Sequence, residues 1–138
     1  MAFDQAQRNV YTSEAVTNGI RVHVTARYSV DQSQPLRDHW FFFYTIEIVN
    51  EGTETVQLIS RHWIITDAEN NVEEARGLGV VGQQPTLAPG ESFEYTSGCP
   101  LKTPFGSMQG TYQMVTADGR KFDVKIAPFA LTEPYTIH

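Results

Sequence analysis

The residues from Trp40 to Val49 read WFFFYTIEIV, and their pattern is the strongest indication of the fold class. Every second side chain from Trp40 to Ile48 is large and apolar, which is the period of a β-strand and not of a helix. The intervening positions begin with Phe41 and Phe43, so both faces are apolar at the start of the strand. Apolar residues on both faces are typical of a strand with neighbours on both sides. We therefore expect this strand in the middle of a sheet, covered on both faces near its beginning.

The same period continues outward in both directions. Between Ile20 and Val30, apolar side chains alternate with polar ones, which indicates a half-buried strand. Further strands are expected over residues 55–66, 71–76, 91–96, 112–116 and 122–126. Ala88-Pro89-Gly90 is typical of a type II turn, and Asp118-Gly119 of a type I′ hairpin turn.

Short strands separated by Gly, Pro and Asn turns, without a helical stripe, predict an all-β fold. We expect one domain over residues 1–138, an antiparallel immunoglobulin or fibronectin type III-like β-sandwich of about seven strands. Short flexible tails are expected at residues 1–10 and 130–138. Residues 76–89 match neither strand nor helix, and loops of that length are often functional.

Composition excludes several classes of protein. The 138 residues carry a net charge of −6 with scattered basic residues, which argues against nucleic-acid binding and against a polybasic membrane surface. No apolar run is long enough for a membrane-spanning helix, and the N-terminus does not resemble a signal peptide. The single cysteine, Cys99, forbids an internal disulfide. These features predict a cytoplasmic protein without membrane insertion.

A glycine motif is the first candidate site. Gly77, Gly79 and Gly82 have the G-x-G-x-x-G spacing of dinucleotide-binding loops, but Pro85 blocks the helix that this mechanism needs. The glycine amides, with Arg76 beside them, could instead form a nest for phosphate or pyrophosphate. The alternative is a purely structural Gly-rich loop.

Histidines supply the second candidate site. His39 and His62 each precede a tryptophan, and they would approach one another if their strands paired. With Asp38 or Asp67 they could bind a divalent metal; the alternative is that each histidine forms a hydrogen bond at a strand end. No cofactor is expected.

Cys99 is the one conceivable nucleophile, and no motif places a base beside it. A buried cysteine usually acts as a small apolar side chain, so we expect no enzyme.

For Phe41 and Phe43, core packing is the default interpretation, and a protein-partner or homodimer surface is the alternative.

Several longer strings resemble the bacterial ApaG family over residues 10–129. They include SRHWIITD at residues 60–67, GLGVVGQQP at residues 77–85 and LAPGESFEYTSGCPL at residues 87–101. The resemblance implies a fibronectin type III-like sandwich and an association with cobalt resistance and Co²⁺/Mg²⁺ efflux. In eukaryotes, similar domains look like protein-binding modules. The resemblance to the ApaG family implies no catalytic residue in this chain.

These observations together predict a non-enzymatic binding module with a protein partner. Any influence on Co²⁺ or Mg²⁺ would be indirect, because a soluble sandwich cannot move ions across a membrane. Phosphate binding at the glycine motif and direct binding of a divalent metal are the two alternatives.

Overall fold

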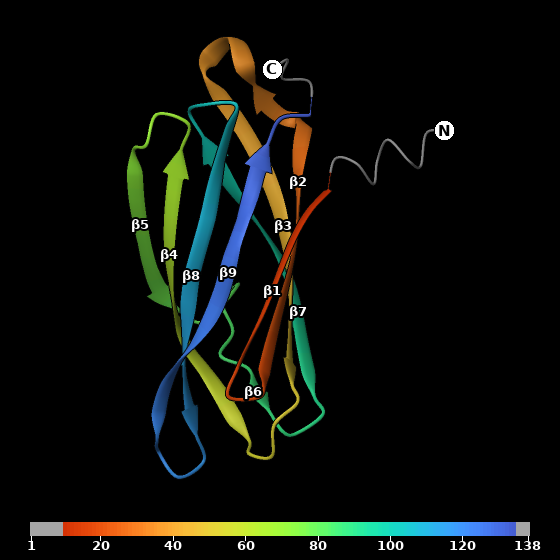
Figure 1. Cartoon of the computed structure of the whole chain (residues 1–138), viewed down its shortest axis with the longest axis vertical. Helices are drawn as coiled ribbons and strands as arrows, with labels where there is room; N and C mark the ends of the chain where they lie inside the picture. The colour runs from red at the N-terminus through yellow and green to blue at the C-terminus, as the bar shows by residue number, and fades with distance from the viewer. Residues whose placement is uncertain (1–9, 135–138) are drawn as a thin grey trace, which may run out of the picture.

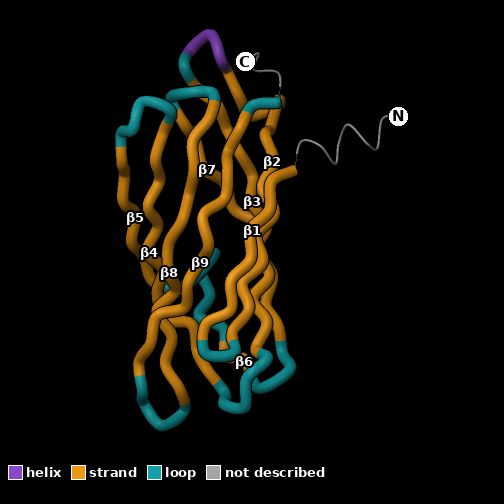
Figure 2. The backbone as a smooth tube through the Cα atoms, in the orientation of Figure 1, coloured by secondary structure: helices purple, strands orange, loops and turns teal. Residues whose placement is uncertain are grey.

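The computed structural model describes residues 10–134, which are almost entirely antiparallel β-structure (Figures 1 and 2). One short 3₁₀ turn, η1 (Pro35–Arg37), interrupts the strands. The nine strands are β1 (Val10–Thr17), β2 (Ile20–Gln34), β3 (His39–Asn50), β4 (Val56–Asp67), β5 (Val72–Leu78), β6 (Thr86–Leu87), β7 (Ser92–Leu101), β8 (Phe105–Thr116) and β9 (Lys121–Thr132). This is two more than the expected number, because β1 and the two-residue β6 were not identified from the sequence.

The strands form two sheets packed face to face, which confirms the predicted β-sandwich. Sheet A has the order β1-β2-β3-β7; sheet B has the order β5-β4-β8-β9, and β6 also pairs with β4. As expected, β3 is a central strand, and Phe42, Ile46 and Ile48 on its inner face are buried. Trp63 of β4 and Tyr112 of β8 belong to the same buried core cluster and come from sheet B.

Two hairpin turns differ from what their sequences predicted. Asn18-Gly19 joins β1 to β2 with φ angles of 48° and 80°, as a type I′ turn requires, although this hairpin was not among those predicted. The type I′ prediction for Asp118-Gly119 is wrong. The Gly119 N–H donates to the Thr116 carbonyl, and of the loop residues only Gly119 has a positive φ. The Thr116 N–H donates to the Arg120 carbonyl, so three residues, 117–119, lie between this pair. A type I turn followed by a left-handed glycine is the usual solution for three residues.

The C-terminal strand continues further than the predicted tail allows. β9 stays paired to β8 as far as Thr132, and Leu131 is fully buried. Pro128 fits inside the strand because the register shifts there, between the pairs Met108–Phe129 and Gly110–Ile126. A bulge is one of the few strand positions that tolerate a missing N–H. The rest of the predicted tails, residues 1–9 and 135–138, lies outside the described residues.

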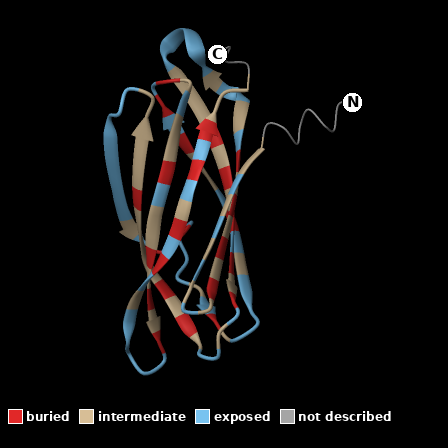
Figure 3. Ribbon diagram, viewed as in Figure 1, coloured by how far each residue is buried: buried red, intermediate tan, exposed pale blue. Residues whose placement is uncertain are grey.

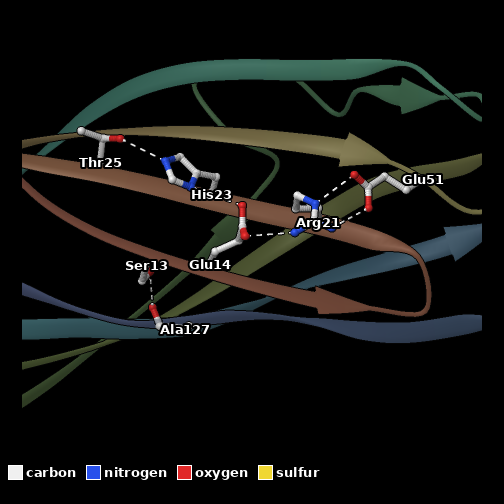
Figure 4. A network of polar contacts seen from close by, with 7 residues as sticks. All are labelled: Ser13, Glu14, Arg21, His23, Thr25, Glu51 and Ala127. Atoms are coloured by element: carbon white, nitrogen blue, oxygen red, sulfur yellow. Dashed lines mark hydrogen bonds and ion pairs between the residues drawn. The ribbon is translucent and has the colours of Figure 1, made fainter.

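The two long sides of the sandwich differ. On one side β1 and β9 are tied together: Ser13 Oγ donates to the Ala127 carbonyl at 2.9 Å (Figure 4), and the Lys125 N–H donates to Thr17 Oγ1 at 3.1 Å. On the other side β5 and β7 are the outermost strands of their sheets, and over residues 10–134 they are not paired with each other. We call this the open side. Nearly all of β5 is exposed (Figure 3).

Candidate functional site

Two cavities lie between the sheets on the open side. The larger, of about 580 Å³, is lined by Ile65 of β4 and Leu101 of β7 among others; the smaller, of about 260 Å³ beside the Gly-rich segment, is lined by Trp63 of β4 and Tyr95 of β7. Ala75 of β5 is paired with Trp63, so its side chain lies on the same face of sheet B. We call the strip of the open side from one cavity past Ala75 to the other the open-side groove.

Arg61 dominates the smaller cavity, which we call the Arg61 cavity. Its Nη1 donates to the carbonyls of Leu78 at 3.0 Å and Gly79 at 2.7 Å. Gly77, which is paired with Arg61 across the sheet, leaves room for the guanidinium, since a Cβ at position 77 would lie 2.7 Å from Arg61 Nη2. The first glycine of the motif therefore accommodates a side chain of the protein itself.

Tyr44 and Tyr95 line the same cavity as Arg61, and Tyr112 lies behind Tyr95. Tyr95 and Tyr112 share a hydrogen bond between their hydroxyls, and Tyr44 is hydrogen-bonded to Ser97. Burial raises the pKa of all three tyrosines, and the charge of Arg61 only partly opposes this effect. The hydroxyls therefore stay protonated near neutral pH, as neutral hydrogen-bonding groups and not as bases.

The remaining glycines of the motif form a tight turn. Val80 and Gln83 exchange both backbone hydrogen bonds around Val81-Gly82, whose φ angles of 42° and 80° make a type I′ turn. Gly79 has a φ of 62°, and its N–H donates to the Ile59 carbonyl at 2.8 Å. Three amides of the segment, those of Gly79, Val80 and Gln83, are thus already bonded to carbonyl oxygens.

Arg76, the predicted cation of the glycine motif, lies on a different face. It is paired with His62 on the outer face of sheet B, where its Nη2 lies 3.7 Å from Glu74 Oε1. The same carboxylate oxygen lies 2.7 Å from His62 Nε2. The cation that reaches the Gly-rich segment is Arg61, which was not among the predicted site residues. Only the pairing of β4 with β5 identifies it, by placing it opposite Gly77.

The structure does not bring the two candidate metal ligands together. His39 starts β3 in sheet A and lines the larger cavity with Asp38 and Asp67, whereas His62 is in sheet B and points outward. Their strands cannot pair, because the connection from β3 to β4 crosses from one sheet to the other. Over residues 10–134, no group of three or more His, Cys, Asp or Glu side chains could hold a metal ion.

The aromatic pair lies outside the core, so core packing is the wrong interpretation for it. Phe41 and Phe43 are half-buried on the outer face of sheet A, with ring centroids 5.1 Å apart. Phe41 lies against Gly98, where a Cβ would come within 2.3 Å of its ring. In the described residues no second layer covers this face. Further along it, Arg21 bridges Glu14 and Glu51, with His23 nearby (Figure 4).

Cys99 is a buried side chain, as the sequence predicts. It is 3% exposed on the inner face of β7, and burial, reinforced by the charge of Glu73, raises its pKa to about 12. Almost no thiolate exists at neutral pH, and the thiolate is the reactive form.

A labelling experiment tests this state of Cys99. We expect the native thiol to react with a disulfide reagent at pH 7.5 about a thousandfold more slowly than a free cysteine, with full reactivity in denaturant. Rapid stoichiometric labelling of the folded protein would contradict the buried, protonated thiol.

The fold and this site define an immunoglobulin- and fibronectin type III-like β-sandwich domain with an open-side groove. Comparison with known proteins narrows the class. The family model of the ApaG domain matches residues 30–116, and the chain belongs to the ApaG family. Over the described residues, no helix is long and apolar enough to cross a membrane.

Relatives match nearly the whole chain. A protein named ApaG from Bordetella pertussis is 58% identical over 119 residues, which cover 86% of this chain and 91% of the relative. A protein named ApaG from Anaeromyxobacter dehalogenans is 54% identical over 126 residues, with 91% and 99% covered. The crystal structure of a Bordetella pertussis protein named ApaA superposes with a TM-score of 0.83 at 56% identity, covering 88% of this chain and 100% of that one.

Proposed function

We propose that the chain is a non-enzymatic, cytoplasmic interaction module that receives an extended segment of a partner protein along the open-side groove. The observation that carries this proposal is the asymmetry of the sandwich. The β1 and β9 edges are tied to each other, whereas β5 and β7 are outermost strands beside a groove with a cavity at each end.

Strand addition supplies the mechanism. A sheet edge offers unpaired N–H and C=O groups, and an incoming segment pairs with them while its alternate side chains enter neighbouring pockets. The edge strand β5 also exposes apolar surface at both ends, with Val72 62% and Leu78 75% exposed. Backbone pairing would supply affinity, and the two cavities of the groove would supply specificity.

In this proposal the association with Co²⁺ and Mg²⁺ homeostasis is indirect and acts through the partner. The half-buried Phe41 and Phe43 give a second candidate surface for a protein or for a second copy of the chain. Phosphate binding at residues 76–82 and metal binding at His39 or His62 stay as predictions. A thermal-shift screen tests both, because a ligand at 100 times its Kd stabilises a protein by about 2.7 kcal/mol.

The groove is tested by site-specific photo-crosslinking followed by affinity measurement. A photo-reactive residue at Ala75, in the groove, is compared with one at Ala117, an exposed alanine in the β8–β9 loop. We expect the purified crosslinked partner to bind Ala75→Arg at least about tenfold more weakly than wild type, and Ala117→Arg with unchanged affinity. Equal affinity for both variants would contradict a groove-bound partner, and weakening by Phe43→Asp alone would move the interface to the aromatic surface.

A further inference from the structure

We infer that the Arg61 cavity is a carboxylate-binding site, and that it takes an Asp or Glu side chain of the segment that enters the open-side groove. The source of the carboxylate rests on the proposed function; the anion site itself rests on the geometry of Arg61.

Arg61 is held by one nitrogen and leaves the others free for a ligand. Nη1 has two hydrogens and makes two hydrogen bonds, to the carbonyls of Leu78 and Gly79. Nε and Nη2 form the remaining edge of the guanidinium, and two parallel N–H groups match the two oxygens of a carboxylate. The two carbonyls fix the plane of the guanidinium before any ligand arrives.

The charge of Arg61 is uncompensated by any carboxylate of the described residues within 4.0 Å. By contrast, Arg21 contacts both Glu14 and Glu51, and Arg120 contacts both Glu54 and Asp118. The chain has a net charge of −6, yet this inward-facing arginine has no carboxylate beside it. Its positive charge is therefore available to pair with the carboxylate of an acidic ligand.

The walls of the cavity suit one small acidic group. The hydroxyl-bearing side chains Tyr44, Tyr95 and Ser97 line it and are neutral, so they neither repel a carboxylate nor compete for its proton. Its volume of about 260 Å³ is far above the roughly 30 Å³ of a water molecule and below the roughly 300–1,000 Å³ of pockets for drug-sized ligands. A side chain fits this space better than a nucleotide does.

The shortage of free backbone amides at the cavity favours a side-chain carboxylate over a chain terminus or a phosphate as the ligand. Terminal carboxylates and phosphates are commonly held by rows of backbone amides. Here the amides of Gly79, Val80 and Gln83 are bonded to carbonyl oxygens, which leaves only the two amides of Val81 and Gly82 at the turn and no longer row of donors. The guanidinium is therefore the main recognition group of the cavity.

The test uses the whole isotope-labelled protein and small probes, followed by NMR. N-acetylglutamic acid α-amide carries only a side-chain carboxylate, and N-acetylglutamine α-amide is its uncharged isostere. We expect the acid to shift the Arg61 Nε–Hε signal and the amide signals of residues 78–83 saturably, with a Kd of about 1–10 mM, and the amide to bind at least about tenfold more weakly. Equal responses to both probes would overturn the inference, as would tighter binding of N-acetylalanine or inorganic phosphate.

Two variants and one control locate the site. Arg61→Lys keeps the charge but loses the two-pronged edge, and we expect at least about a tenfold loss of probe affinity. Ser97→Asp keeps Arg61 and its two carbonyl bonds but puts an internal carboxylate into the cavity, so it should abolish the probe response in a folded protein. Arg76→Gln, on the outer face, should bind like wild type. Unchanged binding by a folded Ser97→Asp protein would overturn the inference.

The probe titration needs no partner protein, so its outcome separates the two proposals. A groove-bound partner that is indifferent to Ser97→Asp would leave the proposed function standing and remove the carboxylate site. A probe response without any crosslink at Ala75 would leave the carboxylate site standing and remove the proposed function.

Discussion

Gly79→Ala is expected to destabilise the protein by about 3–5 kcal/mol, because two separate effects add at this position. The residue has a φ of 62°, which is unfavourable for any residue with a Cβ. That Cβ would also lie 2.2 Å from the Gln83 carbonyl oxygen, a backbone atom fixed by its hydrogen bond to Val80. The type I′ turn would have to open to relieve the contact. Urea unfolding followed by circular dichroism measures the loss.

Gly82→Ala is the matched control for this prediction. Gly82 has a φ of 80°, but no atom lies within 4 Å of the place that its Cβ would take, so only the backbone penalty of about 1–2 kcal/mol applies. Equal losses in the two variants would show that the contact with Gln83 is unimportant. The expected difference also means that a Gly79 variant cannot report on ligand binding, because it disturbs the turn itself. Arg61 and Ser97 are the informative positions.

Asn50→Asp is expected to destabilise the protein by about 3–5 kcal/mol at pH 7. Asn50 is fully buried, and its Nδ2 donates to the carbonyls of Glu54 at 2.8 Å and Leu87 at 2.9 Å. Its Oδ1 accepts the Gly52 N–H at 2.9 Å. An ionised aspartate cannot donate, so two carbonyl oxygens would face a buried negative charge. Thermal and urea unfolding against wild type measure the loss.

The same variant should show a defined pH dependence. Burial and the two carbonyls would raise the pKa of the new carboxyl in the folded state above its unfolded value of about 4. The protonated form can donate one hydrogen bond, so the loss should be smallest below pH 4 and should grow as the pH rises to 7. Asn70→Asp, at an exposed turn position with a φ of 64°, is the control. We expect it to change stability by less than about 0.5 kcal/mol. A pH-independent loss in Asn50→Asp would contradict this account.

Local patterns in the sequence were sufficient for the main strands and for one of the turns. The alternation from Trp40 to Ile48 identified a central strand, and Ala88-Pro89-Gly90 forms the predicted turn, with Gly90 at a φ of 89° and the Glu91 N–H donating to the Ala88 carbonyl. Cys99 is buried as expected. Such features depend on backbone preferences and on the two-residue period, which act over a few neighbouring residues.

The candidate site could not be found in this way, because its members come together only through the register of strand pairing and the packing of one sheet on the other. Arg61 of β4 lies directly opposite Gly77 of β5, and the tyrosines that face it belong to β3 and β7. The G-x-G-x-x-G spacing suggested an anion loop around Arg76, whereas the structure uses its glycines for a turn and for the guanidinium of Arg61.

The alternation of apolar and polar residues is enough to predict an antiparallel β-sandwich whose main strands each carry an apolar face. What lies across from each face became visible only in the folded chain. His39 and His62 are separated because the chain crosses between sheets after β3, and Phe41 and Phe43 are left on an outer face that no second layer covers within residues 10–134. The physical reason is that a period of two fixes the direction in which a side chain points. Which strands exchange hydrogen bonds, and what covers each sheet, depend on long-range packing of the whole chain.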